Sequence, residues 1–225
     1  MERPTRKRMR RPHAVVIAAA IALAVTGCAR LPYTTTIVHE DARVRVVAQH
    51  ELDRPGYTHP LQLSQTDIAS MLRGFSVRQQ QRLPLRWFAE ELPPKPLFRS
   101  DEIMLLAPYL SEALTKVGTD ERVHFEVSAP GINPSMRKDA LAGWLAVRDP
   151  YLYLTIEYFH EQIPTRSSDP YDYNYPTPPP TPKQYLLYFE PGRFWITDDK
   201  GQRVVEFRQF LKSAEADTPI QRPAQ

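Results

Sequence analysis

The sequence predicts one α+β domain with a mainly antiparallel sheet and two to four helices. Helical patterns are grouped in the first half of the chain, at 64–74, 84–92 and 101–117. From residue 123 onward the apolar residues recur with a period of two, as they do in half-buried strands. These strand patterns follow one another through tight turns, which favours antiparallel pairing with the helices segregated from the sheet.

A β-hairpin is predicted at the start of the domain, in residues 34–50. Arg43-Val44-Arg45-Val46 alternates polar and apolar residues after the polar turn His39-Glu40-Asp41. The alternation places the valines on the buried face of a sheet and leaves the arginines in solvent.

Two short helices are predicted next. Ser64 and Asp67 have the spacing of a capping box at the start of the first helix, which Gly74 can end. The second helix is predicted at Pro84–Leu92, because proline suits the first helical position. The polar segment between the two helices is ambiguous, with Val77 on a strand as one interpretation.

The longest helix is predicted at Asp101–Val117, with Ser100 as its cap and Gly118 closing it. Its apolar stripe recurs at three- and four-residue steps, in Ile103, Leu106, Ala107, Leu110, Leu114 and Val117. Pro108 lies inside this pattern, where proline removes a hydrogen bond and costs about 3 kcal/mol. The helix is therefore expected to be kinked or broken at Pro108.

Strands are predicted at Val123–Val127, Trp144–Val147, Tyr151–Phe159 and Tyr185–Glu190. Arg148-Asp149-Pro150 supplies a tight turn between the second and the third. Pro191-Gly192 has the order that a type II turn requires, so Tyr185–Glu190 is predicted to pair with Arg193–Thr197 as a hairpin. Val204–Leu211 fits either a helix or a strand, and residues 214–225 are predicted to be a disordered tail.

The first 27 residues have the composition of a secretory signal peptide. Six basic residues and one acid precede twelve apolar residues, Ala14–Val25, and small residues follow. An apolar run of this length is too short to span a bilayer as a helix, which takes roughly 20 residues. The domain is therefore predicted within residues 34–213.

Val25-Thr26-Gly27-Cys28 resembles the cleavage and lipidation motif of bacterial lipoprotein precursors. The first of the four is more usually Leu in that family. The resemblance implies cleavage after Gly27, several acyl chains on Cys28 and a tether at 28–33. Ala29 resembles the second mature residue of lipoproteins that are sorted to the outer membrane. The alternative is that Cys28, the only cysteine, is an ordinary buried core residue.

Charge argues against nucleic acid as a partner. The leader holds six of the 29 basic residues and one of the 26 acids, which leaves 23 basic and 25 acidic residues. The mature chain thus has a formal charge of −2 and no concentration of Lys and Arg of the kind that nucleic-acid binding needs. Once Cys28 is lipidated, no cysteine remains for a disulfide.

Residues 164–182 are predicted to form an exposed loop of polyproline character, because seven of the nineteen are proline. A long loop inside a domain is often functional. The candidate contacts with a partner are Tyr171, Tyr173, Tyr175, Pro178, Pro179 and Pro180. The alternative is a stiff connecting loop with its tyrosines folded back on the sheet.

No catalytic or metal-binding motif is present in the sequence. Three histidines are followed directly by an acid, in His39-Glu40, His50-Glu51 and His160-Glu161. None of them has a second histidine at the spacing of a zinc-binding helix, and His59 and His124 are isolated. Asp169, Asp172 and Asn174 lack the spacing of a calcium loop. No catalytic residue, metal ion or cofactor is predicted beyond the covalent lipid on Cys28.

Two functions remain open. The first is a non-catalytic binding or assembly domain, held by a lipid in the bacterial cell envelope, on the outer membrane, with another envelope protein or cell-wall glycan as its partner. The alternative is an envelope enzyme that cleaves cell-wall glycan through acids such as Glu90, Glu91, Glu126 and Glu157. The enzyme hypothesis predicts a cleft with two close carboxylates or a His–acid pair, whereas the binding hypothesis predicts an open sheet or loop surface.

Overall fold

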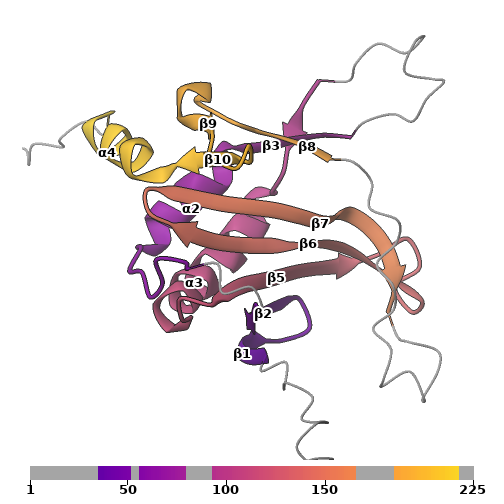
Figure 1. Ribbon diagram of the computed structural model, residues 1–225. Helices are drawn as coiled ribbons and strands as arrows, with labels where there is room; N and C mark the ends of the chain where they lie inside the picture. The colour runs from indigo at the N-terminus through magenta and orange to yellow at the C-terminus, as the bar shows by residue number, and fades with distance from the viewer. Residues whose placement is uncertain (1–34, 52–55, 80–92, 166–184, 218–225) are drawn as a thin grey trace, which may run out of the picture. The chain divides into compact units, whose positions relative to one another are not determined.

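The main element of the protein is a seven-stranded antiparallel sheet (Figure 1). The computed structural model describes residues 35–51, 56–79, 93–165 and 185–217. The strand order is β1 (Thr35–Glu40), β2 (Val44–His50), β5 (Glu121–Pro130), β6 (Arg137–Arg148), β7 (Tyr151–Pro164), β10 (Arg203–Glu206) and β9 (Trp195–Thr197). Each strand pairs antiparallel with its neighbours.

A second, three-stranded sheet and three helices complete the described part of the domain. The small sheet has the order β4 (Lys95–Pro96), β3 (Phe75–Gln79) and β8 (Tyr185–Phe189). The helices are α2 (Gln65–Gly74), α3 (Ser100–Lys116) and α4 (Phe207–Asp217), with one 3-10 turn at Gly192–Phe194. The predicted α+β class with a mainly antiparallel sheet is confirmed. No helix among these described residues is long and apolar enough to cross a membrane.

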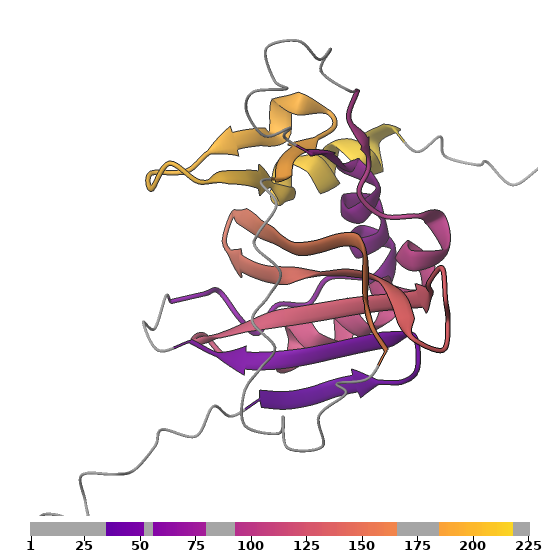
Figure 2. The same ribbon diagram turned by 90° about the vertical axis from the view of Figure 1, so that its right-hand side faces the viewer.

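Helices α2 and α3 lie along one face of the large sheet (Figures 1 and 2). The strands turn alternate side chains toward them, since successive residues of a strand point to opposite faces. Val46 of β2, Phe125 of β5 and Leu145 of β6 are at most 1% exposed in this layer. Leu110 and Leu114 of α3 are wholly buried against the same core. The opposite face of the sheet is free of α2 and α3.

The N-terminal hairpin is confirmed, with β1 pairing β2. Its turn begins later than predicted, because β1 continues through His39 and Glu40 and only Asp41 of the predicted turn lies outside the strands. The Asp41 carboxylate closes its turn by accepting hydrogen bonds from the backbone N–H groups of Arg43 and Val44, each at 2.7 Å. The His39 ring, 3.0 Å from the same carboxylate, and these two bonds lower the pKa of Asp41 to about 2. The turn is therefore held in its ionised form across the physiological range.

The predicted capping box of α2 is present. Ser64 Oγ accepts from the Asp67 N–H and the Asp67 carboxylate accepts from the Ser64 N–H, both at 3.1 Å. Gly74 is the last residue of the helix, and β3 begins at once with Phe75. A Cβ at Gly74 would lie 2.5 Å from the Phe189 ring, so glycine here permits a close approach of β8.

Helix α3 differs from its prediction at both ends. Arg99, and not Ser100, occupies the N-cap position, and its N–H donates to the Glu102 carboxylate at 2.8 Å. At the other end Val117 leaves the helix in extended backbone, so Gly118 does not close it. The side chain of Val117 is 1% exposed, so the chain leaves the helix while this residue stays packed in the core.

Pro108 does not break α3 into two helices. The helix runs unbroken from Ser100 to Lys116 with Pro108 inside it. The carbonyl deprived of its partner belongs to Met104, which is 67% exposed. Water can therefore bond that carbonyl, while the apolar stripe on the other side of α3 keeps the helix on the sheet.

The predicted hairpin of Tyr185–Glu190 with Arg193–Thr197 is wrong. β8 pairs with β3 in the small sheet, whereas β9 pairs with β10 in the large one. Pro191-Gly192 leads into a 3-10 turn instead of a type II turn. The pairing of Phe75 with Phe189, whose rings meet edge-on at 4.9 Å, buries two large side chains that a local hairpin would leave apart.

The segment Val204–Leu211, for which a helix and a strand were both predicted as alternatives, contains one after the other. Strand β10 passes directly into helix α4. Helix α4 extends to Asp217, so the predicted tail from 214 begins inside a helix. Phe207 and Phe210 anchor α4 on the core. The predicted helix at 84–92, the segment 1–33 and the loop from 166 onward lie outside the described residues.

Candidate functional site

The face of the large sheet opposite α2 and α3 carries a connected group of polar and aromatic side chains. It is termed the Tyr158 cluster and comprises His124 and Glu126 of β5, Lys138 and Trp144 of β6, and Glu157 and Tyr158 of β7. On β5 these residues alternate with the buried Val123, Phe125 and Val127, which face the helices. Period-two alternation thus builds a core on one face and a polar surface on the other.

Trp144 is the aromatic centre of this face. It lies opposite His124 in the sheet register, and the two ring centroids are 4.4 Å apart. The Arg122 guanidinium lies 3.8 Å from the Trp144 ring centroid, a cation–π contact. The same guanidinium is 2.8 Å from the Glu51 carboxylate. Trp144 is therefore held between two partners while remaining partly exposed.

Small residues beneath the cluster keep its surface low and broad. Ala140, Ala142 and Ala146 lie on the same face of β6 and are at most 4% exposed, because the large side chains around them cover them. Such a surface presents ring faces and charged groups side by side, which suits binding to an extended partner.

His124 is paired with an acid that is distant in sequence. Its Nε2 lies 3.1 Å from Glu157 Oε2, and the two side chains are 12% and 29% exposed. A bulge in β7 makes this possible, because Tyr158 opposes Ala142 while Ile156 opposes Gly143. Glu157 is the extra residue between them, so both Glu157 and Tyr158 serve the polar face.

Three carboxylates on this face act on the Tyr158 hydroxyl through their charge. Burial raises the pKa of Tyr158, and the charges of Glu157, Glu126 and Glu161 raise it further. The phenol therefore stays protonated at neutral pH and can donate a hydrogen bond.

Glu126 remains ionised although it is largely buried. Burial alone would raise its pKa, but the hydrogen bond and charge of Lys138, with the Ser128 hydroxyl at 3.0 Å and the nearby His124, lower the pKa below its ordinary value. The cluster thus offers acceptors, a phenol donor and an indole face within one surface.

Lys138→Met is expected to raise the pKa of Glu126, because burial then acts without the ammonium that opposes it. In the wild type the stability from this group is present above pH 4.5 and is lost as the pH falls through the lowered folded pKa. An NMR titration of the glutamate carboxyl carbons measures the shift. Lys116→Met, which breaks the exposed pair with Glu112, is the matched control. An unchanged Glu126 titration in Lys138→Met would contradict the assignment.

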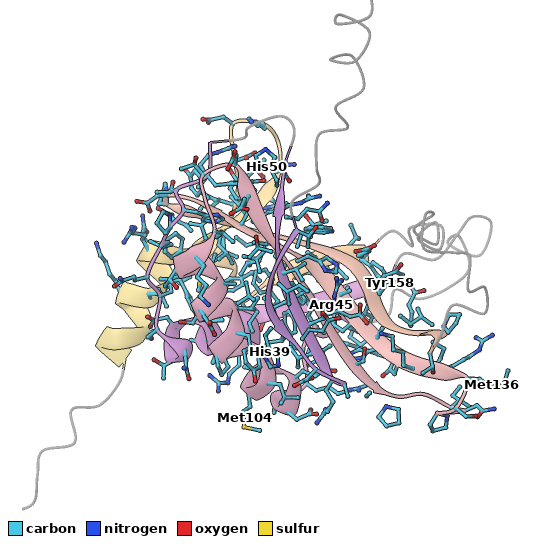
Figure 3. All side chains as sticks on the ribbon, turned by 90° about the horizontal axis from the view of Figure 1, so that it is seen from below. His39, Arg45, His50, Met104, Met136 and Tyr158 are labelled. Carbon is cyan, nitrogen blue, oxygen red and sulfur yellow. The ribbon has the colours of Figure 1, made fainter. Side chains whose placement is uncertain are left out.

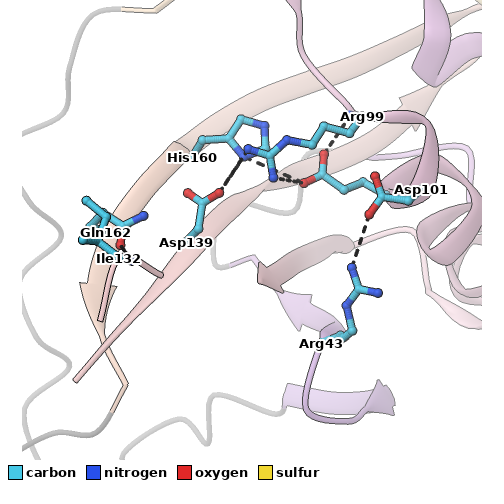
Figure 4. A network of polar contacts seen from close by, with 8 residues as sticks. Arg43, Arg99, Asp101, Ile132, Asp139, His160 and Gln162 are labelled. Atoms are coloured by element: carbon cyan, nitrogen blue, oxygen red, sulfur yellow. Dashed lines mark hydrogen bonds and ion pairs between the residues drawn. The ribbon is translucent and has the colours of Figure 1, made fainter. Parts of the chain in front are cut away.

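A second polar group joins the start of α3 to β6 and β7 (Figure 4). Arg99 lies 3.2 Å from the Asp139 carboxylate and 3.6 Å from that of Glu102, whose side chain is only 4% exposed. His160 Nδ1 lies 3.4 Å from Asp139 and 3.8 Å from Glu102. His160 has a φ of 46°, a left-handed conformation that a non-glycine residue adopts at a cost of about 1–3 kcal/mol. This group fixes α3 against the β6–β7 hairpin.

The structure sorts the other histidines flagged by the sequence. His39 stacks on Tyr109 with ring centroids 3.6 Å apart, and His50 lies 3.2 Å from Asp120. His59 is 3% exposed, with both ring nitrogens hydrogen-bonded to backbone groups. Each of these three has a structural partner, as ordinary surface or core histidines do. Within the described ranges no group of three or more His, Cys, Asp or Glu side chains is placed to hold a metal ion.

Several of the residues considered from the sequence, both predicted sites and rejected candidates, lie outside the described ranges. They are Val25, Thr26, Gly27 and Cys28, the acids Glu90 and Glu91, and the loop residues Asp169, Tyr171, Asp172, Tyr173, Asn174, Tyr175, Pro178, Pro179 and Pro180. Of the acids considered, the structure brings Glu126 and Glu157 to one face. Trp144, Lys138 and Tyr158 were not singled out from the sequence. Alternation along β6 nevertheless places Lys138 and Trp144 on its polar face.

The fold and this surface define an α+β domain whose sheet has one face covered by helices and one polar, aromatic face. Comparison with family models, curated proteins and solved structures gives no match.

Proposed function

We propose that this chain is a lipid-anchored protein of the bacterial cell envelope whose domain binds a partner through the Tyr158 cluster. The anchor is inferred from the basic leader, the apolar segment and Val25-Thr26-Gly27-Cys28. Two or more acyl chains hold a protein stably on a bilayer, whereas one holds it only marginally. The role is binding or assembly, and the anchor keeps the domain at the membrane where its partner is found.

The observation that carries the binding role is the polar face built around Trp144. Tryptophan, tyrosine and arginine dominate the binding energy of protein interfaces, and this face holds Trp144, Tyr158 and Arg122 together. An indole face flanked by hydrogen-bonding groups can also stack on a sugar ring. The partner is therefore another envelope protein or cell-wall glycan, on the outer membrane.

Cys28→Ala is expected to move the protein from the membrane fraction to the soluble fraction, because the acyl chains provide the attachment. Mass spectrometry of the purified native protein should find an acylated Cys28 as its first residue. A native chain that begins at Met1, or that carries a free thiol at position 28, would refute the envelope proposal.

Crosslinking in cells tests the polar face in the same strains. A photo-crosslinking amino acid at Thr155, which is exposed and lies opposite Trp144, is expected to capture the partner. The matched control is the same amino acid at Arg73, exposed on α2 on the helical side. Equal capture at both positions would exclude this face. A chain without Tyr171–Pro180 shows whether the predicted loop contributes, since unchanged capture excludes it.

One observation favours an enzyme as the second candidate. The enzyme hypothesis requires a His–acid pair or two close carboxylates, and His124 lies 3.1 Å from Glu157 with Glu126 on the same face. Such groups can transfer protons to and from a glycosidic oxygen, an effect of roughly 100- to 10,000-fold. Hydrolysis of purified cell-wall glycan that is lost in both Glu126→Gln and Glu157→Gln would establish catalysis and displace the binding proposal.

A further inference from the structure

The tip of the hairpin between β5 and β6 exposes two apolar side chains. Ile132 is 90% exposed and Met136 is 66% exposed. Figure 3 shows Met136 at the extremity of this hairpin, well away from Met104 of α3, another exposed methionine. An isolated exposed apolar residue is ordinary, but two in one turn of six residues form a local apolar tip.

This tip is a closed and hydrogen-bonded structure. The Ile132 N–H donates to Gln162 Oε1 at 2.9 Å, and the Gly131 N–H donates to the Arg137 carbonyl at 3.2 Å. The N–H groups of Met136 and Arg137 both donate to the Asn133 carbonyl, at 2.9 and 2.7 Å. The two apolar side chains are thus carried by a turn that four backbone N–H groups hold through hydrogen bonds.

Gly131 shows how tightly the turn is packed. A Cβ at this position would lie 2.4 Å from Gln162 Oε1 and 2.6 Å from the Arg137 carbonyl oxygen. Glycine therefore lets β7 reach the turn and supply the amide oxygen that bonds Ile132.

The chemistry of the tip suits a lipid surface. Residues 130–137 contain no acid and one cation, the exposed Arg137. Pro130 and Pro134 have no N–H to desolvate, and four of the other N–H groups are bonded internally. Unbonded backbone groups make a loop costly to place in a bilayer, and the internal bonds of these four N–H groups lower that cost.

We propose that this tip is a membrane-contact element that inserts Ile132 and Met136 at the boundary between the lipid headgroups and acyl chains. The inference rests on the proposed lipid anchor. Residues 28–34 can span at most roughly 25 Å, so an acylated Cys28 keeps the domain beside the bilayer. The tip then fixes how the domain is oriented on that surface.

A bilayer fits this tip better than a protein does. A stable protein interface buries about 800 Å² on each partner with some 20–30 residues, whereas the apolar surface here comes from two side chains on a protruding turn. Shallow insertion needs only a few apolar side chains and gains from a nearby cation at an anionic surface. Arg137 supplies that cation.

The test uses the mature acylated chain, which begins at Cys28, in vesicles of phosphatidylethanolamine with a minority of phosphatidylglycerol, some of it carrying brominated acyl chains. A Ser135→Cys chain carries an environment-sensitive dye between Ile132 and Met136. A Lys200→Cys chain carries the same dye on the turn after β9. The dye at 135 is expected to be quenched by the brominated lipid about threefold more than the dye at 200.

Adding Ile132→Asp and Met136→Asp to the Ser135→Cys chain should abolish that difference while the urea unfolding curve stays unchanged. Equal quenching at 135 and 200 would overturn the proposal. The anchor has its own readout, because an acylated Cys28 cannot take the dye. A dye found on Cys28 of the unsubstituted chain would show that the proposed anchor has failed, separately from the tip.

Discussion

Gly143→Ala is expected to destabilise the domain by about 3 kcal/mol, the upper range for overpacking a core. Gly143 lies in the middle of β6, and an added Cβ would be 2.4 Å from the Thr155 carbonyl oxygen. It would also lie 3.0 Å from the Phe125 ring and 3.1 Å from Ile156. The first of these contacts is with backbone, which cannot rotate away. Relief would require β7 to move at the bulge that positions Glu157.

Urea unfolding followed by tryptophan fluorescence measures this effect. Gly192→Ala is the matched control, because Gly192 has nothing within 4 Å of an added Cβ and no left-handed backbone. Its expected change is within about 0.5 kcal/mol. If Gly143→Ala were as stable as Gly192→Ala, the close packing of β6 against β7 would be contradicted. The same bulge in β7 positions Glu157 beside His124. Gly143→Ala should therefore also break the hydrogen bond between His124 and Glu157.

His59→Leu is expected to destabilise the protein by about 2–4 kcal/mol at pH 7.5, because two buried backbone groups lose their partner. The Nδ1–H of His59 donates to the Glu121 carbonyl, and its Nε2 accepts from the Val147 N–H, both at 3.0 Å. This bonding requires the neutral ring. Leucine has a similar size but can make neither bond.

The same residue gives the wild type a pH dependence of known sign. Burial lowers the pKa of His59 below 6.5, against the opposing effect of the backbone carbonyls of Glu121 and Gly118. The unfolded chain therefore binds the proton first, and the stability from neutral His59 is present above pH 6.5 and lost as the pH falls through the folded pKa. The loss is at most about 1.4 kcal/mol per pH unit.

The stability difference between wild type and His59→Leu should accordingly shrink when urea unfolding is repeated at successively lower pH. His50→Gln, which removes a half-exposed histidine paired with Asp120, is the control and should cost less than about 1 kcal/mol. A difference that stays constant from pH 7.5 to pH 5 would show that His59 is not the titrating group.

The sequence predicts only part of the polar face of the large sheet. Alternation along β5 places His124 and Glu126 on one face and Phe125 on the other. This prediction needs only the period of two of a β-strand. The same rule applied to β7 puts Glu157 and Tyr158 on opposite faces, which is wrong. A bulge in one strand is fixed by its pairing with the neighbour, so the pair of His124 with Glu157 could not be found from local spacing.

The sequence by itself determined the features that depend on residues a few positions apart. These are the capping box of Ser64 and Asp67, the apolar stripe of α3, the turn at Asp41 and the α+β class. The signal peptide and lipidation motif in residues 1–28 also depend on neighbouring residues alone, and they remain a prediction. Such features arise from short-range hydrogen bonds and from a periodicity that one element carries alone.

Only the tertiary structure decided which strands pair, where α3 ends and what faces Trp144. β8 joins β3 because Phe75 and Phe189 bury each other across more than a hundred residues of chain. The free energy that selects these arrangements comes from burying side chains contributed by distant segments. That burial exists only once the segments have met, which is why a local pattern such as Pro191-Gly192 can favour a turn that the folded chain does not make.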